Sequence, residues 1–362
     1  MTSSNKSIQL GLCCINTHLR AQKPPIFASR SIILKTFNEK GFEYLKEKII
    51  QNLEDVLKIM DYNELIGIKV YRLSSGMFPH KSNPKAPTYD LEFARDILKK
   101  IGDKSRELNQ RLTYHPGQYN VIGTPSEEAF KNTCLDLQYH ADILDMMELD
   151  QHSVMVIHGG GKYGDKEATK IRWCKQFKTL SESIKKRLVL ENCEKNFSIH
   201  DCLEISEIIH IPVVFDTHHF ECYKLLHPDE TFHPPEYYIP KILDTWHKRN
   251  IKPKFHVSEQ GSGRCGHHSD FIETIPNYLL EIPEKYGIHI DIMIEAKMKE
   301  QAILKLYAKY PHLNCQVKSD NSLFDKGPTS QWITTHIKDC DCCTYNYKPK
   351  RKFKIVDEFT KC

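Results

Sequence analysis

The side chains best suited to chemistry in this 362-residue chain stand at the ends of short apolar runs. Six of eight such runs end in a residue that can bind a metal ion: His115, His158, Glu191, Asp216, His256 and Glu295. Just beyond the sixth and seventh runs lie His219 and His268. A single histidine at such a place is usually a hydrogen-bonded core residue. Six potential ligands after six different runs instead indicate one shared metal centre.

Three carboxylates that converge in a space without water repel one another and raise one another's pKa values. Divalent cations remove this repulsion, so the cluster predicts its own metal ions. The set exceeds the four ligands of one tetrahedral ion, which favours two or three ions with Glu191 as the bridging carboxylate. Imidazole and carboxylate ligands together suit Zn2+ or Mn2+. Closely spaced ions suit phosphodiester hydrolysis, but a metal barrel also serves sugar isomerisation, so the ligands leave both reactions open.

Four further residues are candidates for contact with DNA. Gln118 and Tyr119 follow His115 in a loop, where a hydrogen-bonding side chain and a ring could wedge into a duplex or stack on a base. Asn16 and Arg72 could contact phosphate, and structural hydrogen bonding explains both equally well.

Lys254 stands two residues before His256 and therefore points to the same side of its strand. A buried ammonium beside metal ions is costly, which makes Lys254 a candidate for neutralisation or modification. We expect catalytic roles for Glu191, Lys254 and His256.

The apolar runs predict eight short strands buried on both faces: 8–15, 66–73, 111–114, 154–157, 188–190, 213–215, 255–257 and 290–294. Helical periodicity fills the intervals, as in 42–60 and 130–144, and Thr124 with Glu127 predicts the cap of the second helix. Eight strand–helix repeats predict an α/β fold, a (β/α)8 TIM barrel with a C-terminal extension, whose strand ends meet on one face. An open doubly wound sheet is the alternative, but no Gly-x-Gly-x-x-Gly turn supports it.

Composition is that of a globular enzyme, with 40% hydrophobic and 27% charged residues. A net charge of +4 does not indicate a nucleic-acid partner, although 51 Lys and Arg residues can form a local basic face. The sequence shows neither a membrane-spanning run nor a signal peptide, so we expect an intracellular monomer without a membrane partner. Its thirteen cysteines read mainly as free buried thiols.

Residues 1–306 are predicted to form the barrel, and residues 307–362 an extension that is partly disordered or packed on the barrel. The extension carries a basic patch of Lys348, Lys350, Arg351 and Lys352. It also carries three cysteines after His336, at a spacing unlike that of common zinc sites: Cys340, Cys342 and Cys343.

In nine segments the chain resembles the UV damage endonuclease family. In order they are LGLCCIN, YRLSSGMFP, LTYHPGQYN, HGGG, LENCE, FDTHH, KFHVSEQ, HSDFI and IMIEAKMKEQA. The resemblance covers residues 8 to about 306 and implies a barrel related to those of apurinic endonucleases and xylose isomerases. Leu12 departs from the family, which often carries an aromatic ring there, so a lesion contact from this position is not expected.

The resemblance implies an enzyme that nicks double-stranded DNA immediately 5′ of a cyclobutane dimer, a (6-4) photoproduct or an abasic site. The nick would leave a 3′-hydroxyl and a 5′-phosphate and start an alternative excision repair. The resemblance also implies that Gln118 and Tyr119 probe the lesion from the intact strand while the damaged dinucleotide is flipped out.

About three divalent ions are implied as well, with Mn2+ favoured over Zn2+ or Mg2+. One ion would be held by His115, His158 and Glu191, and a second by Glu191, Asp216, His256 and Glu295. The third would be held by His219 and His268, with an oxygen from Lys254 if that side chain is carboxylated.

Two other functions stay open on the sequence. A sugar isomerase or epimerase would use the same barrel but has no use for a Gln-Tyr wedge. A catalytically silent DNA-binding barrel has no use for a complete set of metal ligands.

Overall fold

Eight short parallel strands form the centre of the computed structural model, which describes residues 7–314 and 327–336. The strands are β1 (Ile8–Cys13), β2 (Val70–Arg72), β3 (Arg111–Thr113), β4 (Met155–His158), β5 (Leu188–Glu191), β6 (Val213–Val214), β7 (Lys254–Val257) and β8 (Ile290–Ile294). Each predicted strand is therefore present. The largest shift of an end is at β2, which begins at Val70 rather than at Ile66.

The strands close into a barrel. Hydrogen bonds order five of them as β3-β2-β1-β8-β7 and three as β4-β5-β6. Single parallel bridges join the two groups, Tyr114 to Met155 on one side and Asp216 to His256 on the other. Because β1 pairs with both β2 and β8, the first and last strands are neighbours. The predicted TIM barrel is thus confirmed, and the open sheet is wrong.

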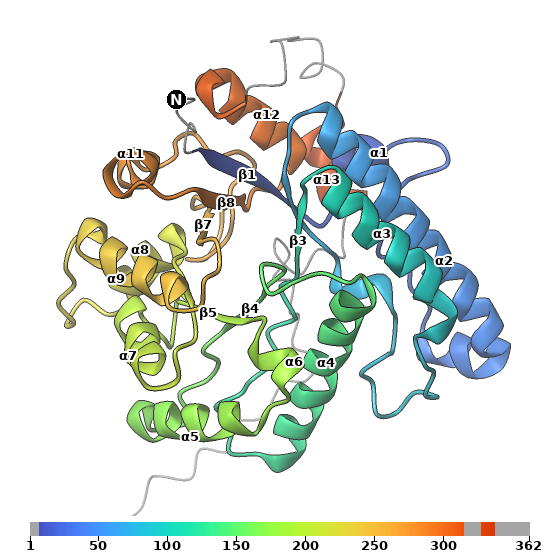
Figure 1. Ribbon diagram of the computed structural model, residues 1–362, viewed down its shortest axis with the longest axis horizontal. Helices are drawn as coiled ribbons and strands as arrows, with labels where there is room; N and C mark the ends of the chain where they lie inside the picture. The colour runs from blue at the N-terminus through green and yellow to red at the C-terminus, as the bar shows by residue number, and fades with distance from the viewer. Residues whose placement is uncertain (1–6, 315–326, 337–362) are drawn as a thin grey trace, which may run out of the picture.

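Helices surround this barrel on the outside (Figure 1). The α-helices are α1 (Thr17–Arg20), α2 (Leu34–Leu65), α3 (Arg95–Glu107), α4 (Glu127–Met146), α5 (Lys166–Thr179), α6 (Glu182–Lys185), α7 (Ile199–Ile209), α8 (Thr217–Leu226), α9 (Pro235–His247), α10 (Asn277–Leu280), α11 (Ile282–Tyr286), α12 (Glu300–Lys309) and α13 (Ser330–His336). Three 3-10 helices join them, η1 (Ser75–Met77), η2 (Glu92–Ala94) and η3 (Pro311–Leu313).

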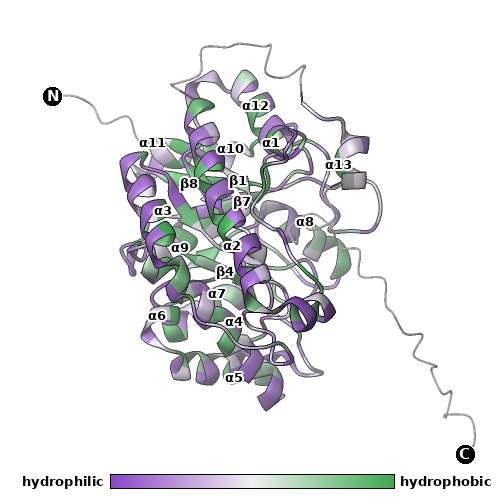
Figure 2. Ribbon diagram, turned by 90° about the vertical axis from the view of Figure 1, so that its right-hand side faces the viewer, coloured by the Kyte–Doolittle hydropathy of each residue, from purple (hydrophilic) through white to green (hydrophobic). Residues whose placement is uncertain are grey.

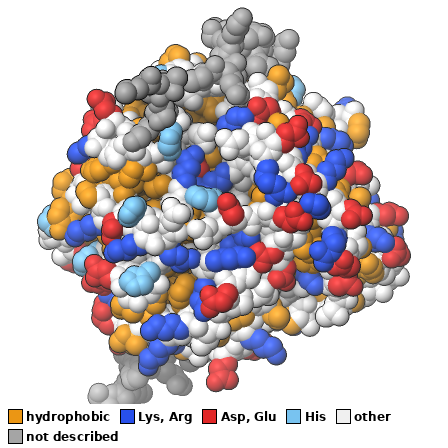
Figure 3. Space-filling model, viewed as in Figure 1, with side chains coloured by type: hydrophobic (Ala, Val, Ile, Leu, Met, Phe, Trp, Pro, Cys, Tyr) orange, Lys and Arg blue, Asp and Glu red, His pale blue; other side chains and the backbone are white. Residues whose placement is uncertain are grey.

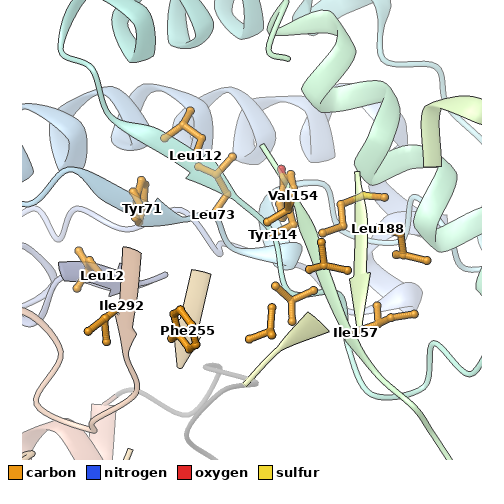
Figure 4. Packing of buried hydrophobic residues seen from close by; sticks show 14 of the residues in the cluster. Leu12, Tyr71, Leu73, Leu112, Tyr114, Val154, Ile157, Leu188, Phe255 and Ile292 are labelled. Carbon is orange, nitrogen blue, oxygen red and sulfur yellow. The ribbon is translucent and has the colours of Figure 1, made fainter. Parts of the chain in front are cut away.

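The core lies inside the barrel and between the strands and the helices. Side chains from neighbouring strands pack against one another there, for example Leu12 of β1, Ile292 of β8 and Phe255 of β7 (Figure 4). The strands are hydrophobic, whereas helices such as α3 and α5 present hydrophilic residues outward (Figure 2). All five residues of β8 are buried, as expected of a strand covered on both faces.

The predicted cap of α4 is wrong by two residues. Ser126, not Thr124, is the N-cap, and its side chain accepts from the backbone N–H of Ala129. The Thr124 hydroxyl instead accepts from the backbone N–H of Ser126, before the helix begins. Both residues suit a cap chemically, so only the backbone decides which of them fills that position.

Near its C-terminus the described chain packs on the barrel. Ile333 of α13 is 5% exposed within the main core, and Gln301 of α12 donates to the carbonyl of Pro328. The predicted boundary at residue 306 falls inside α12, and the division into two domains stays a prediction. Cys340, Cys342, Cys343 and the basic patch at 348–352 lie outside the described residues.

In the described part of the chain the cysteines are free thiols, five of them buried: Cys13, Cys174, Cys193, Cys202 and Cys222. Across the same residues, no helix combines the length and apolar character needed to cross a bilayer.

Candidate metal centre

The barrel brings the predicted ligands together at the carboxyl ends of its strands. His158 and Glu191 are the last residues of β4 and β5, and Glu295 directly follows β8. The remaining ligands come from the end of β7 and from the loops or helices after β3, β6 and β7: His256, His115, Asp216, His219 and His268. This is the face on which TIM barrels carry their active sites.

Glu191 lies at the middle of the cluster and is fully buried. One of its oxygens lies 2.9 Å from His115 Nε2 and 3.2 Å from His158 Nε2. Its other oxygen accepts from His256 Nδ1 at 2.8 Å and lies 3.6 Å from His219 Nδ1. One carboxylate therefore faces imidazoles from four different strand ends.

Glu295 is the second carboxylate that faces potential ligands. Its Oε1 lies 3.3 Å from His256 Nδ1, and its Oε2 lies 3.8 Å from His268 Nε2. Asp216 completes this side, since its ligand atom and those of His256 and Glu295 all lie within 4.8 Å of one another.

Three overlapping groups of potential ligands result. They are His115 with Glu191 and His256, His158 with Glu191 and His219, and Asp216 with His256 and Glu295. The division implied by the family resemblance differs, because it pairs His219 with His268 and joins His115 to His158. In the structure His219 lies with His158 and Glu191, and His268 approaches the cluster through Glu295.

The charges in this cluster are strongly coupled. Burial would raise the pKa of Glu191, but His256 and His158 outweigh burial and hold that pKa well below its usual range. Burial raises the pKa of Asp216 to about 6, against the lowering effect of His219. Burial lowers the pKa of His256 to about 4, so this ring is neutral at pH 7 and can act as a ligand.

The residues fit divalent cations on grounds of their own chemistry. Three buried carboxylates meet around His256, which burial keeps neutral. Arg72 beside Glu295 and the protonated ring of His219 supply only two positive charges against them. Two buried ligand atoms, Asp216 Oδ2 and His256 Nε2, have no hydrogen-bond partner in the described part of the chain. Burying a polar atom without a hydrogen-bond partner is unfavourable in free energy, and a bound cation would give both atoms a partner.

Lys254 is the first residue of β7, two positions before His256, and it is fully buried. Its Nζ has no hydrogen-bond partner among the described residues. Burial, together with the positive charges of Arg72 and Arg111, lowers the pKa of Lys254 to about 7.

Arg72 and Asn16 do not lie where DNA could reach them. Arg72 is 1% exposed, and its guanidinium donates to Glu295 Oε1 at 2.7 Å and to Cys13 Sγ. Asn16 is also 1% exposed, and its side chain caps α1 by accepting from Leu19 N–H. Structural hydrogen bonds therefore account for both buried side chains, and the structure does not support the predicted phosphate contacts.

Gln118 and Tyr119 do lie at the surface, in the loop after β3. Both are exposed, Tyr119 to 62%. A side chain at Gly117 would place its Cβ 2.5 Å from Tyr119 Cε1, so the glycine lets the ring lie close against the backbone of its own loop. The pair is thus available to a ligand at the barrel rim.

Three residues near the centre were not singled out from the sequence. Asn192 follows Glu191, and its side chain both accepts from Asp216 N–H and donates to Asp216 O. The carbonyl of Asn192 accepts from His219 Nδ1 at 3.0 Å, which fixes the orientation of that ring. The rings of His218 and His268 lie 6.1 Å apart, and negative charge on Glu194 helps to raise the pKa of His219. The motifs LENCE and FDTHH contain these residues but do not show which of them face the centre.

A fourth group of potential metal ligands, made only of acidic residues, lies on the outer helices. Glu167, Asp201 and Glu204 offer oxygens close together, but Lys170 forms ion pairs with all three. An amine already neutralises this group, so it is a poor cation site compared with the cluster at the strand ends.

Basic and acidic side chains lie interspersed over the face shown in Figure 3, beside hydrophobic ones. This pattern agrees with the small net charge of +4. Charge on this face does not by itself mark a path for a polyanion.

Comparisons with known proteins give a consistent result. Residues 8–322 match the model of the family described as UV-endonuclease UvdE. A protein of Acanthamoeba polyphaga mimivirus with the provisional name UV-damage endonuclease is 40% identical over 88% of this chain and 96% of its own length. The UV-damage endonuclease of Schizosaccharomyces pombe is 36% identical over 83% of this chain, which spans only half of that longer protein. The crystal structure of SacUVDE superposes with a TM-score of 0.69 at 29% identity, covering 84% of this chain and 99% of SacUVDE.

Proposed function

Because the chain belongs to the UV-endonuclease UvdE family, we propose that it hydrolyses the DNA backbone immediately 5′ of UV photoproducts. Cyclobutane dimers and (6-4) products are the proposed lesions, and abasic sites are a further substrate. The proposed products are a 3′-hydroxyl and a 5′-phosphate, from which excision repair can proceed.

The observation that carries this proposal is the convergence of His, Glu and Asp side chains around Glu191 at the strand ends. About three divalent cations, Mn2+ in preference to Zn2+ or Mg2+, are proposed to bind there. Cations bound in such a centre polarise a phosphate and offset the negative charge that develops in phosphodiester cleavage.

The residues of the chain prepare the centre for this substrate. Glu191 would hold the cations together, because its two oxygens face opposite sides of the cluster. His256 Nδ1 lies 2.8 Å from Glu191 and 3.3 Å from Glu295, so these carboxylates fix the ring, which would be a neutral ligand for a cation that they hold. Buried walls exclude bulk water and strengthen the electrostatic interactions inside.

Lys254 is proposed as the third catalytic residue. Its Nζ is fully buried and can hold or release a proton close to neutral pH. A neutral amine can also add carbon dioxide, with loss of a proton, to give the carbamate that the family resemblance implies. Mass measurement of the intact protein under native conditions distinguishes the free amine from the carbamate.

Lesion reading is assigned to Gln118 and Tyr119. Both are exposed at the same rim as the metal centre, on the loop that directly follows the ligand His115. Stacking of an aromatic side chain on a base contributes about 1–3 kcal/mol. Tyr119 would contribute discrimination of this size between damaged and undamaged DNA, and Gln118 would add hydrogen bonds.

A test of this function uses an end-labelled duplex that carries a single thymine dimer. With Mn2+ present, we expect one nick immediately 5′ of the dimer and none after chelation. Cleavage that ignores the dimer would contradict damage specificity. Binding without any nick would identify a silent barrel, and turnover of a sugar without any nick would identify an isomerase.

A further inference from the structure

The loop that carries Tyr119 is held by a buried carboxylate of the neighbouring helix α4. Asp136 is fully buried. Its Oδ1 accepts from the hydroxyl of Tyr119 at 2.9 Å and from the hydroxyl of Ser82 at 2.6 Å. Its Oδ2 accepts from Asn120 Nδ2 at 2.7 Å. One side chain therefore contacts two consecutive residues of the loop and a residue of the loop after β2.

Asp136 is the shared acceptor for these three groups. Asn120 uses both protons of its amide, since Nδ2 also donates to the carbonyl of Gly117 at 2.9 Å. Turning this amide over would place its oxygen against the Gly117 carbonyl. An asparagine at position 136 could still accept from Asn120 and donate to the two hydroxyls, so alanine is the change that removes all three bonds.

The same helix joins this loop to the metal centre. One turn after Asp136, His140 is fully buried, and its Nδ1 donates to the Asp136 carbonyl at 2.7 Å. His140 Nε2 lies 3.0 Å from the hydroxyl of Ser75, which is 3.5 Å from the carbonyl of the ligand His115. The loop between His115 and Asn120 is thus anchored to α4 through Asp136 on the side of the ring, and Ser75 lies between α4 and the ligand His115 on the other side.

We propose that Asp136 is a positioning residue for damage recognition, which holds the Tyr119 ring in a preformed orientation at the barrel rim. This inference rests on the proposed function, because it takes Tyr119 as the residue that contacts the lesion. Holding a side chain in its bound orientation before binding lowers the entropy cost of recognition. Loss of the tether should therefore weaken binding to damaged DNA more than binding to undamaged DNA.

The experiment compares the variants D136A, Y119F and Y119A. Equilibrium binding to a duplex with one thymine dimer and to the undamaged duplex is measured with the cations present and with a chelator. Y119F keeps the ring and removes only the hydroxyl, from an exposed side chain whose loss should not affect folding. We expect D136A and Y119F each to lower the ratio of the two affinities by about tenfold, the scale of one hydrogen bond to a charged group.

The double variant D136A/Y119F should lower the ratio no further than D136A alone, because D136A already removes the bond that Y119F removes. D142A is the matched control, since Asp142 lies on the same helix and accepts from Gln138 rather than from the loop. Thermal unfolding and Mn2+ content show whether a variant has lost its fold or its cations instead.

The outcomes separate the inference from the function on which it rests. If Y119A leaves the ratio unchanged, Tyr119 does not read damage and the proposed recognition fails. If Y119A lowers the ratio but Y119F and a folded D136A do not, the ring acts without its tether and the role of Asp136 is refuted. A full additive loss in the double variant would also refute a shared bond.

Discussion

At the scale of single residues, the centre depends on Glu191. Its two oxygens lie within 3.2 Å of three imidazoles, which come from the ends of β3, β4 and β7. A glutamine has the same shape but carries a donor where the carboxylate has an acceptor. We therefore regard the negative charge of this side chain, rather than its volume, as the property that the site requires.

Glu191→Gln should abolish cleavage while the fold persists. We expect the rate of nicking to fall by more than about a hundredfold, the upper end of the effect of losing an outer-shell partner of a metal ligand. Single-turnover nicking measures the rate, and circular dichroism measures the fold. Full activity in a folded variant would rule out a bridging role for Glu191.

Cation binding should strengthen as pH rises, because of His219. Burial alone would lower the pKa of this ring, but the charges of Asp216 and Glu191 raise it to about 9 in the cation-free protein. An imidazolium cannot be a ligand, so a cation must displace the proton. The affinity for Mn2+ should rise as pH increases toward 9, with release of protons that calorimetry in two buffers detects. An affinity that does not vary between about pH 7 and pH 9 would contradict this role of His219.

The ligands could be predicted from the sequence because each follows a recognisable apolar run, and a barrel must bring run ends together. Arg72 and Asp136 could not be assigned in this way. The partner of Arg72, Glu295, is 223 positions away in the chain, so the sequence shows a charge but not its neutralisation. Asp136 lies on a helix and accepts from three loop donors, a convergence that only the folded backbone creates.

At the scale of elements, α8 links folding to the metal centre. Asp216 is the N-cap of this helix, where Oδ1 accepts from the backbone N–H groups of His218 and His219 at 2.8 Å each. The other oxygen, Oδ2, is buried without a hydrogen-bond partner in the described part of the chain. One carboxylate thus starts the helix with one oxygen and offers the other to a cation.

Substitutions of Asp216 should separate these two roles. Asparagine caps helices as well as aspartate, so Asp216→Asn should keep the free energy of unfolding in the presence of chelator but weaken Mn2+ binding. Asp216→Ala should weaken binding and also cost about 1 kcal/mol of stability. Urea unfolding and calorimetry measure the two effects. Equal stability of the two variants would show that the cap has no energetic role.

The strands and their order were predictable because the alternation of apolar runs is strong over the whole barrel. The number of helices was not, because the described residues form thirteen α-helices where eight strand–helix repeats were expected. The ends of the helices and strands were less predictable than the strand order, as the N-cap of α4 shows. Thr124 and Ser126 are both good caps, and the choice follows from the path of the loop after β3. Hydrogen bonds from Arg172 and Gln176 of α5 to the carbonyls of Gly123 and Thr124 hold that path, and they are invisible in the local sequence.

At the scale of the whole molecule, the metal centre lies where the two groups of strands meet. Glu191 ends β5 in the three-stranded group, whereas His256 and Glu295 belong to the five-stranded group. The backbone joins the groups only through single bridges on each side. Cations held by ligands from both groups would therefore also stabilise closure of the barrel, by mass action on the folded state.

The most direct measurement is an anomalous difference map from crystals of the protein grown with Mn2+. We predict peaks among the side chains at the strand ends, each within bonding distance of residues from the set His115, His158, Glu191, Asp216, His219, His256, His268 and Glu295. A map without peaks there would contradict a metal centre built from the strand ends. Ions found instead only at Glu167, Asp201 and Glu204 on the outer helices would contradict it equally.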